Sequence, residues 1–135
     1  MTNRCCMFIG NDAYDQAVFI KALGDVAPNT ICITAENAYE ALTVLVDGNI
    51  LPGYIFVELS MPGMSGIEFL KTVKSIPALR DIQIIVHSTS PQPNKVLELK
   101  ELGALAIYFR PYEYAGICNM LSLYFVDEMG VIKQN

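Results

Sequence analysis

The sequence predicts a doubly wound α/β domain with a five-stranded parallel sheet and helices on both faces. Five short, almost wholly apolar stretches are each followed by a stretch whose apolar residues recur at helical spacing. Strands that are apolar on both sides are typical of parallel sheets covered by helices on each face. The chain has 135 residues, of which 53% are hydrophobic, and this suits one domain with a full core.

The five expected strands are apolar or rich in β-branched residues, and they cover Arg4–Ile9, Thr30–Ala35, Tyr54–Leu59, Gln83–Ser88 and Ala106–Phe109. The expected helices lie between and after them, over Asp15–Leu23 with Gly24 as its stop, from a cap at Asn37 to Asp47, from a cap at Ser65 through Val73, from Pro93 to Gly103, and from Tyr114 to Phe125 with Gly130 as its stop. We expect residues 1–135 to form a single domain, with a core over about residues 4–126 and no output domain.

The composition excludes several classes of protein. The net charge is −5 and the nine basic residues are scattered, which argues against direct binding of nucleic acid. No apolar run approaches the ~20 residues that span a bilayer, so we expect a cytoplasmic protein with no membrane contact. The four cysteines lack metal-binding spacing, and we expect them to be reduced thiols in the core.

Several segments resemble the receiver domain of two-component response regulators. Glu58–Gly66 reads E-L-S-M-P-G-M-S-G, similar to the family's D-L-x-M-P-x-M-x-G. Ser88 ends an I-I-V-x-S strand, and Gly103-Ala104 followed by Arg110-Pro111-Tyr112 resembles G-A-x-x-x-x-x-K-P-F. Residues 35–42 resemble the family's A-x-x-G-x-E-A-L. The resemblance spans roughly residues 4–126 and is to a stand-alone, chemotaxis-regulator-like bacterial receiver.

The resemblance implies a flavodoxin-like sheet in the order 2-1-3-4-5 and a site at the carboxyl ends of its strands. In this family an aspartate after the third strand accepts a phosphoryl group from a histidine kinase. Two acidic residues after the first strand hold Mg²⁺ together with that aspartate. A Ser or Thr and a Lys contact the phosphoryl oxygens, which here would be Ser88 and Arg110.

The chain departs from the family inside this pocket. The phospho-acceptor position is Glu58, and Arg110 replaces the lysine. The acid pair falls on Gly10 and Asn11 in one register, with Asp12 just after, and on Asn11 and Asp12 in the other. Since Mg²⁺ prefers hard oxygen ligands, we expect weak Mg²⁺ binding at most, with Asp12 and Glu58 as ligands if any, and no other cofactor.

Three interpretations of the pocket stay open. Glu58 can pair with Arg110 and imitate an aspartyl phosphate, because guanidinium matches a carboxylate bidentately. The pocket can be a degraded one whose charges merely pair, or Glu58 can still accept a phosphoryl group. At the family's aromatic switch position stands Ile107, and strand alternation places its neighbour Tyr108 on the opposite face.

We therefore expect a signalling module, not an enzyme, that acts through protein–protein interaction and has impaired phosphorylation. Its partner would be a histidine kinase or a downstream target, and a homodimer could form through the region of Tyr108, Tyr112 and Tyr114. One alternative is a working phospho-accepting regulator in a histidine-kinase phosphorelay. A more distant one is a flavin or nucleotide binder, although no glycine-rich phosphate-binding loop follows any strand. The single histidine, His87, is expected to have a core or edge role.

Overall fold

The computed structural model describes residues 4–89, 92–109 and 113–125. Its sheet has five parallel strands in the order β2-β1-β3-β4-β5, which confirms the predicted topology. The strands are β1 (Arg4–Ile9), β2 (Thr30–Ala35), β3 (Tyr54–Glu58), β4 (Gln83–Ser88) and β5 (Ala106–Phe109). Their bounds match the predicted ones except that β3 ends one residue early.

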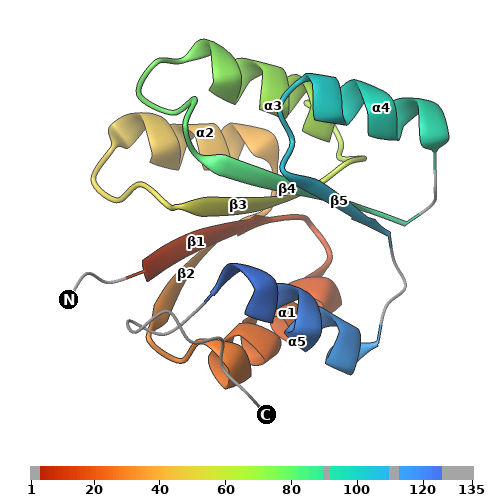
Figure 1. Ribbon diagram of the computed structural model, residues 1–135. Helices are drawn as coiled ribbons and strands as arrows, with labels where there is room; N and C mark the ends of the chain where they lie inside the picture. Colours follow the sequence, from red (N-terminus) through yellow and green to blue (C-terminus); the bar gives the residue numbers. More distant parts are fainter. Residues whose placement is uncertain (1–3, 90–91, 110–112, 126–135) are drawn as a thin grey trace.

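Five helices cover the sheet in two layers (Figure 1). They are α1 (Ala13–Val26), α2 (Ala38–Asp47), α3 (Gly66–Ser75), α4 (Pro93–Glu101) and α5 (Tyr114–Tyr124). α2, α3 and α4 lie on one face, and α1 and α5 lie side by side on the other. Among the described residues no helix is long and apolar enough to cross a membrane.

Each face of the sheet carries its own apolar core. The core under α2, α3 and α4 is aliphatic for the most part and contains Met7, Ile9, Ile55, Val57, Leu70 and Leu99. The core under α1 and α5 is richer in aromatic rings and contains Cys6, Phe8, Phe19, Phe56 and Phe125. Odd-numbered residues of β1 face the first core and even-numbered ones the second, as strand alternation requires.

The predicted caps of α2 and α3 are confirmed, whereas α1 continues past Gly24, α4 ends at Glu101 before Gly103, and α5 ends at Tyr124 before Gly130. Asn37 accepts a hydrogen bond from the Glu40 amide, and Gly48 ends α2 in the left-handed region at φ 75°. Gly24 does not stop α1, so that prediction is wrong. The helix continues to Val26 because this side chain is buried against the same core as Phe19 and Leu23. Tertiary burial therefore outweighs the low helix propensity of one glycine.

The turn after β3 is held by side chains that the sequence predicts. The Ser65 hydroxyl accepts a hydrogen bond from the Glu68 amide, and the Glu68 carboxylate accepts one from the Ser65 amide. This reciprocal capping box starts α3 at Gly66. The Gly66 amide in turn donates to the carbonyl of Leu59 at 2.8 Å, which fixes α3 directly against the end of β3.

Gly66 is a point where no side chain fits. A Cβ atom there would lie 2.7 Å from the Glu58 carbonyl oxygen and 2.9 Å from the Leu59 Cα atom. Both neighbours are backbone atoms, so the strand end itself would have to move. We expect Gly66→Ala to lower the free energy of unfolding by about 2 kcal/mol, the usual scale of overpacking.

Chemical denaturation of the purified protein measures this loss, and Gly24→Ala is the matched control. Gly24 is exposed, and a Cβ atom there would meet nothing within 4 Å. This second change should stabilise the protein by about 0.5–1 kcal/mol through helix propensity. Equal effects of the two substitutions would contradict the close packing of Gly66.

Candidate functional site

The carboxyl ends of the central strands bring several predicted site residues to one edge. Gly10 directly follows β1, Glu58 is the last residue of β3, and Ser88 is the last residue of β4. The Gly10 amide donates to the Ala35 carbonyl at 3.0 Å, and the Leu59 amide donates to the His87 carbonyl at 2.8 Å. These bonds extend the parallel ladders past the strands, so the backbone at this edge is held firmly.

Glu58 lies against Gly10 across that edge. A Cβ atom on Gly10 would lie 3.2 Å from Glu58 Oε1 and 4.0 Å from Glu58 Cβ. Gly10 is buried, whereas Asn11 next to it is exposed. The carboxylate of Glu58 therefore borders the volume that an acidic side chain at position 10 would need.

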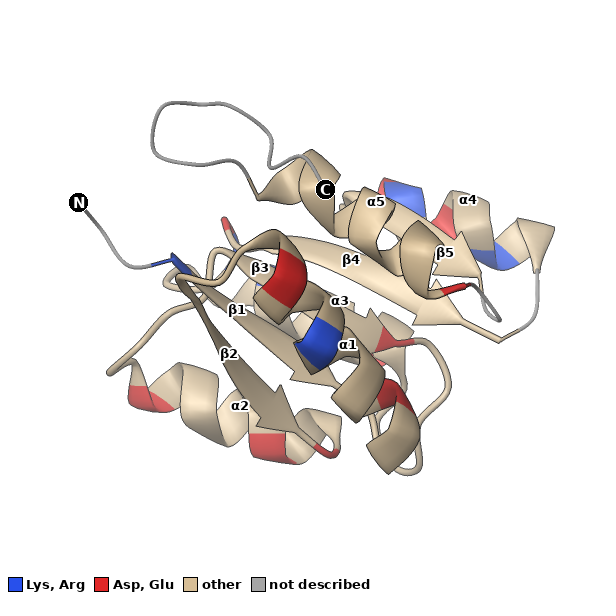
Figure 2. Ribbon diagram, turned by 90° about the horizontal axis from the view of Figure 1, so that it is seen from below, with Lys and Arg blue, Asp and Glu red and all other residues tan. Residues whose placement is uncertain are grey.

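Asp12 serves the first helix. Its carboxylate accepts a hydrogen bond from the Asp15 amide at 3.0 Å and caps the N-terminus of α1. It is also close enough to act on Glu58. Burial raises the pKa of Glu58, and the negative charge of Asp12 raises the pKa further. Figure 2 shows acidic segments near the arrowheads of the central strands and at the start of α1.

The remaining predicted residues are only partly described. Ser88 is buried at the end of β4, and Ile107 of β5 is paired with Val86. Ile107 packs against the core under α2, α3 and α4, whereas Tyr108 packs against the opposite core, which confirms the predicted alternation. Arg110 and Tyr112 lie outside the described residues, as does Gly130 itself.

The tyrosines near the last strand make contacts within the molecule. The Tyr108 and Tyr124 hydroxyls are 2.8 Å apart. The Tyr114 hydroxyl donates to the carboxylate of Asp25, and Lys21 Nζ donates to that hydroxyl at 3.3 Å. These contacts of Tyr114 join the start of α5 to α1.

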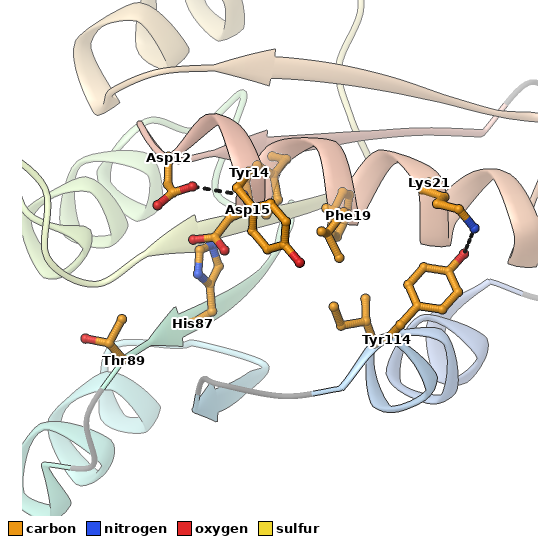
Figure 3. A pocket seen from close by; sticks show the side chains of 11 residues that line it. Asp12, Tyr14, Asp15, Phe19, Lys21, His87, Thr89 and Tyr114 are labelled. Atoms are coloured by element: carbon orange, nitrogen blue, oxygen red, sulfur yellow. Dashed lines mark hydrogen bonds between the residues drawn. The ribbon is translucent and has the colours of Figure 1, made fainter.

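A groove of about 680 Å³ runs beside the acidic edge, between α1 and the start of α5. Asp12 and Asp15 border one end and Lys21 with Tyr114 the other, and the ring of His87 projects from β4 toward Asp15 at the acidic end (Figure 3). No pattern in the sequence indicates this groove. Its residues come from four separate elements, so no sequence spacing indicates that they meet.

His87 is the unusual residue of this groove. Its side chain is 4% exposed and stacks on Phe8, with ring centroids 5.2 Å apart. Among the described residues neither ring nitrogen has a hydrogen-bond partner. Burial lowers the pKa of His87 to about 4, so the ring is neutral at physiological pH. The predicted core role is consistent with this burial, but its unpartnered nitrogens were not foreseen.

The donor set at the edge does not fit a strong Mg²⁺ site. Gly10 supplies no ligand, Asp12 is used as a helix cap, and the longer Glu58 occupies the space beside Gly10. No cluster of three or more histidine, cysteine, aspartate or glutamate side chains suited to a metal ion occurs among the described residues. Mg²⁺ needs near-octahedral oxygen ligands, usually with one or two well-placed carboxylates. This pocket provides few such ligands.

Residues 11–122 match the family described as the response regulator receiver domain. The chain belongs to this family. Receiver domains are signalling modules of two-component systems, and this assignment accounts for the sheet order and for the cluster at the carboxyl edge. It leaves the flavin- or nucleotide-binding alternative without support.

Two curated relatives resemble this receiver domain in sequence. The two-component response regulator ORR6 of Oryza sativa is 29% identical over 84% of this chain and 66% of its own length. The sporulation initiation phosphotransferase F of Bacillus subtilis is 30% identical over 67% of this chain and 69% of its own length. The receiver domain thus spans about two thirds of each of these relatives.

Solved structures show the same fold. The Mn²⁺-bound form of response regulator Rcp1 has a TM-score of 0.84 and 17% identity, with 97% of this chain and 99% of that chain covered. The chemotaxis response regulator CheY4 of Vibrio cholerae has a TM-score of 0.78 and 22% identity, with 89% and 97% covered. At these identities the likeness concerns the fold alone.

Proposed function

We propose that this receiver domain signals through protein–protein contacts and that its pocket supports phosphoryl transfer poorly. The observation that carries the proposal is the contact between Glu58 and Gly10, with Oε1 only 3.2 Å from the place of a missing Cβ atom. One acidic ligand of the family's pocket is absent, and the longer acceptor leans toward its place.

The physics of phosphoryl transfer explains why this arrangement matters. The reaction depends almost entirely on positioning and on neutralising charge, which the divalent ion supplies in the family. Glu58 places its carboxylate one methylene farther from the strand than an aspartate would. A displacement near 1 Å costs about 100-fold in rate. The loss of metal ligands at Gly10 and Asn11 adds to this cost.

Exposure of the wild-type protein to acetyl phosphate and Mg²⁺, followed by intact-mass measurement, tests the proposal. We expect the mass to remain unchanged, because the pocket lacks both the acidic metal ligands at Gly10 and Asn11 and a correctly placed acceptor. A matched receiver that keeps all three carboxylates, run in parallel, shows that the reagents are active. A gain of one phosphoryl group by the wild type would instead favour a working regulator, of the kind that the name of the B. subtilis relative indicates.

The surface over α4 and β5 is the proposed contact site for the partner, and a second copy is one candidate. Leu97 of α4 is 63% exposed, and Leu105 and Phe109 nearby in the chain are exposed too. Contiguous exposed apolar side chains favour a protein interface, and we take these three residues as members of that surface. Tyr108 and Tyr114 make hydrogen bonds within the molecule. We therefore place the centre of the proposed interface at Leu97, Leu105 and Phe109 and not at the tyrosines.

Sedimentation of the wild type and of Leu97→Glu tests this surface. The side chain is mostly solvent-exposed, so the substitution should leave the free energy of unfolding within about 0.5 kcal/mol. We expect the wild type to self-associate and the variant to lose most of that association. Tyr14→Ser, on an exposed residue of α1, is the control and should behave as the wild type does. A wild type that remains monomeric at all concentrations would exclude the homodimer.

A further inference from the structure

Two cysteines lie directly opposite one another on neighbouring strands. Cys6 of β1 and Cys32 of β2 are register partners in the parallel ladder. Both side chains point to the core under α1 and α5, since Cys6 belongs to that core and Cys32 packs against it. Neighbouring strands are about 4.8 Å apart, which lies within the span of roughly 4.4–6.8 Å between the Cα atoms of disulfides.

The two thiols differ in environment and influence one another. Cys6 is fully buried, whereas Cys32 is only partly buried on β2, an edge strand of the sheet. Interaction with the Cys6 thiol lowers the pKa of Cys32, and the same interaction together with burial raises the pKa of Cys6. The more accessible sulfur is thus also the one that ionises first, which makes it the nucleophile of the pair.

The other two cysteines lack this arrangement. Cys5 lies on the opposite face of β1 by strand alternation, and its register partner is Ile31. Cys118 belongs to α5. These two thiols therefore serve as internal controls for the reactivity of the pair.

We propose that Cys6 and Cys32 form an oxidisable dithiol, a modification site at which a hydroperoxide converts the two thiols into a reversible disulfide between β1 and β2. This proposal is independent of the phosphorylation state of the acidic pocket.

The disulfide forms with hydrogen peroxide in two steps. The Cys32 thiolate attacks one oxygen of hydrogen peroxide, the O–O bond breaks, and Cys32 becomes a sulfenic acid while the released hydroxide takes up a proton to form water. The Cys6 sulfur then attacks the sulfenic sulfur, its proton leaves with the hydroxyl as a second water, and the S–S bond forms. The neutral sulfenic acid no longer opposes ionisation of Cys6 by its charge, so the second step is favoured once the first is complete.

The expected disulfide is easily reduced. Side chains of register partners in a parallel ladder leave the strands in the same direction, so their Cβ atoms stay near the strand spacing of about 4.8 Å, wider than the usual ~3.8 Å of a disulfide. Closing this gap strains the bond, and strained disulfides are the labile ones. Reduced glutathione should therefore restore both thiols.

Treatment of the reduced protein with hydrogen peroxide tests the site. We expect the intact mass to fall by two hydrogen atoms and a non-reducing digest to contain the Cys6 and Cys32 peptides joined. Glutathione should reverse both changes. With Cys6→Ser, the sulfenic acid at Cys32 should persist and be trapped by dimedone, whereas Cys32→Ser should react at least about tenfold more slowly than the wild type.

Cys5→Ser and Cys118→Ser should retain the wild-type rate and product. The digest of the wild-type protein needs no substitution, so the test stands even if a Cys6 variant folds poorly. A disulfide that involves Cys5 or Cys118, a dimedone adduct mainly on either of them, or an unchanged mass would overturn the proposal.

Discussion

Replacing Gly10, Asn11 and Glu58 together by aspartate is expected to produce a receiver domain that gains one phosphoryl group from acetyl phosphate and Mg²⁺. The triple change restores both members of the acid pair and shortens the acceptor. Shortening removes a close contact, because a Cβ atom at position 10 would lie 3.2 Å from Glu58 Oε1 and the retained glutamate would have to shift. Since positioning and charge neutralisation dominate this reaction, we expect a gain of at least about 100-fold in rate.

The partial variants separate the effect of the missing acid pair from the effect of the longer acceptor side chain. Glu58→Asp alone should remain unphosphorylated because the metal ligands are still missing. Gly10→Asp with Asn11→Asp should also remain so, because the longer acceptor crowds the new carboxylate. Intact-mass measurement after equal incubation compares all of them. A mass gain for Glu58→Asp alone would show that the acid pair is dispensable and would contradict the proposed role of Gly10 and Asn11.

Stability against denaturant gives a second readout for the triple variant. Three carboxylates near one another repel, so the variant should be less stable than the wild type without Mg²⁺. Bound Mg²⁺ removes this repulsion and should add about 1.4 kcal/mol at ten times its Kd. The wild type should show little such dependence, because its donor set does not fit the ion.

We also expect the protein to lose folding stability at acidic pH, and we expect the protonation of His87 on unfolding to cause much of this loss. The folded-state pKa of His87 is about 4, below the ordinary value of 6.5. The unfolded chain therefore binds more protons than the folded one between these values, and stability falls as the pH is lowered through that window. The shift corresponds to about 3 kcal/mol in total, of which about 2 kcal/mol is lost by pH 5.

His87→Phe should remove this pH dependence. The substitution keeps a ring against Phe8 and has no titrating group, so it should be more stable than the wild type at pH 5. Glu58 has the opposite effect on acid stability. Its pKa is raised in the folded state, so the folded protein binds this proton more readily than the unfolded chain and is stabilised as the pH falls. Glu58→Gln isolates that part. Urea denaturation from pH 7 to pH 4 compares the three proteins, and equal slopes for wild type and His87→Phe would exclude His87 as the cause.

The local elements of this fold could be predicted because their signals are local. Apolar stretches such as Gln83–Ser88 read as buried strands, and the Ser65 and Glu68 pair marks the start of a helix within four residues. Gly48 ended α2 as expected, because the backbone enters the left-handed region there at φ 75°. Gly24 is also a glycine, but it does not end α1, because the burial of Val26 favours continuation of the helix past it.

The candidate site was predicted as a set of positions, without its contacts. Sequence motifs and the rule for parallel sheets placed Glu58, Ser88 and the end of the first strand at one edge. They could not show that Glu58 leans toward Gly10 or that Asp12 caps α1 while raising the pKa of Glu58. These features depend on where side chains from separate strands and helices point after packing.

The fold class could be predicted from the sequence alone, the strand order through family resemblance, and the unusual residues of the pocket from their motif positions. Periodicity and caps act over a few residues, and an unusual residue in a motif is visible without coordinates. Three features are visible only in the folded protein: Cys6 faces Cys32, both nitrogens of His87 lack a described partner, and Glu58 borders the space beside Gly10. The reason is physical: register, burial and cavity shape arise when distant segments pack, and no spacing along the chain records the distances between them.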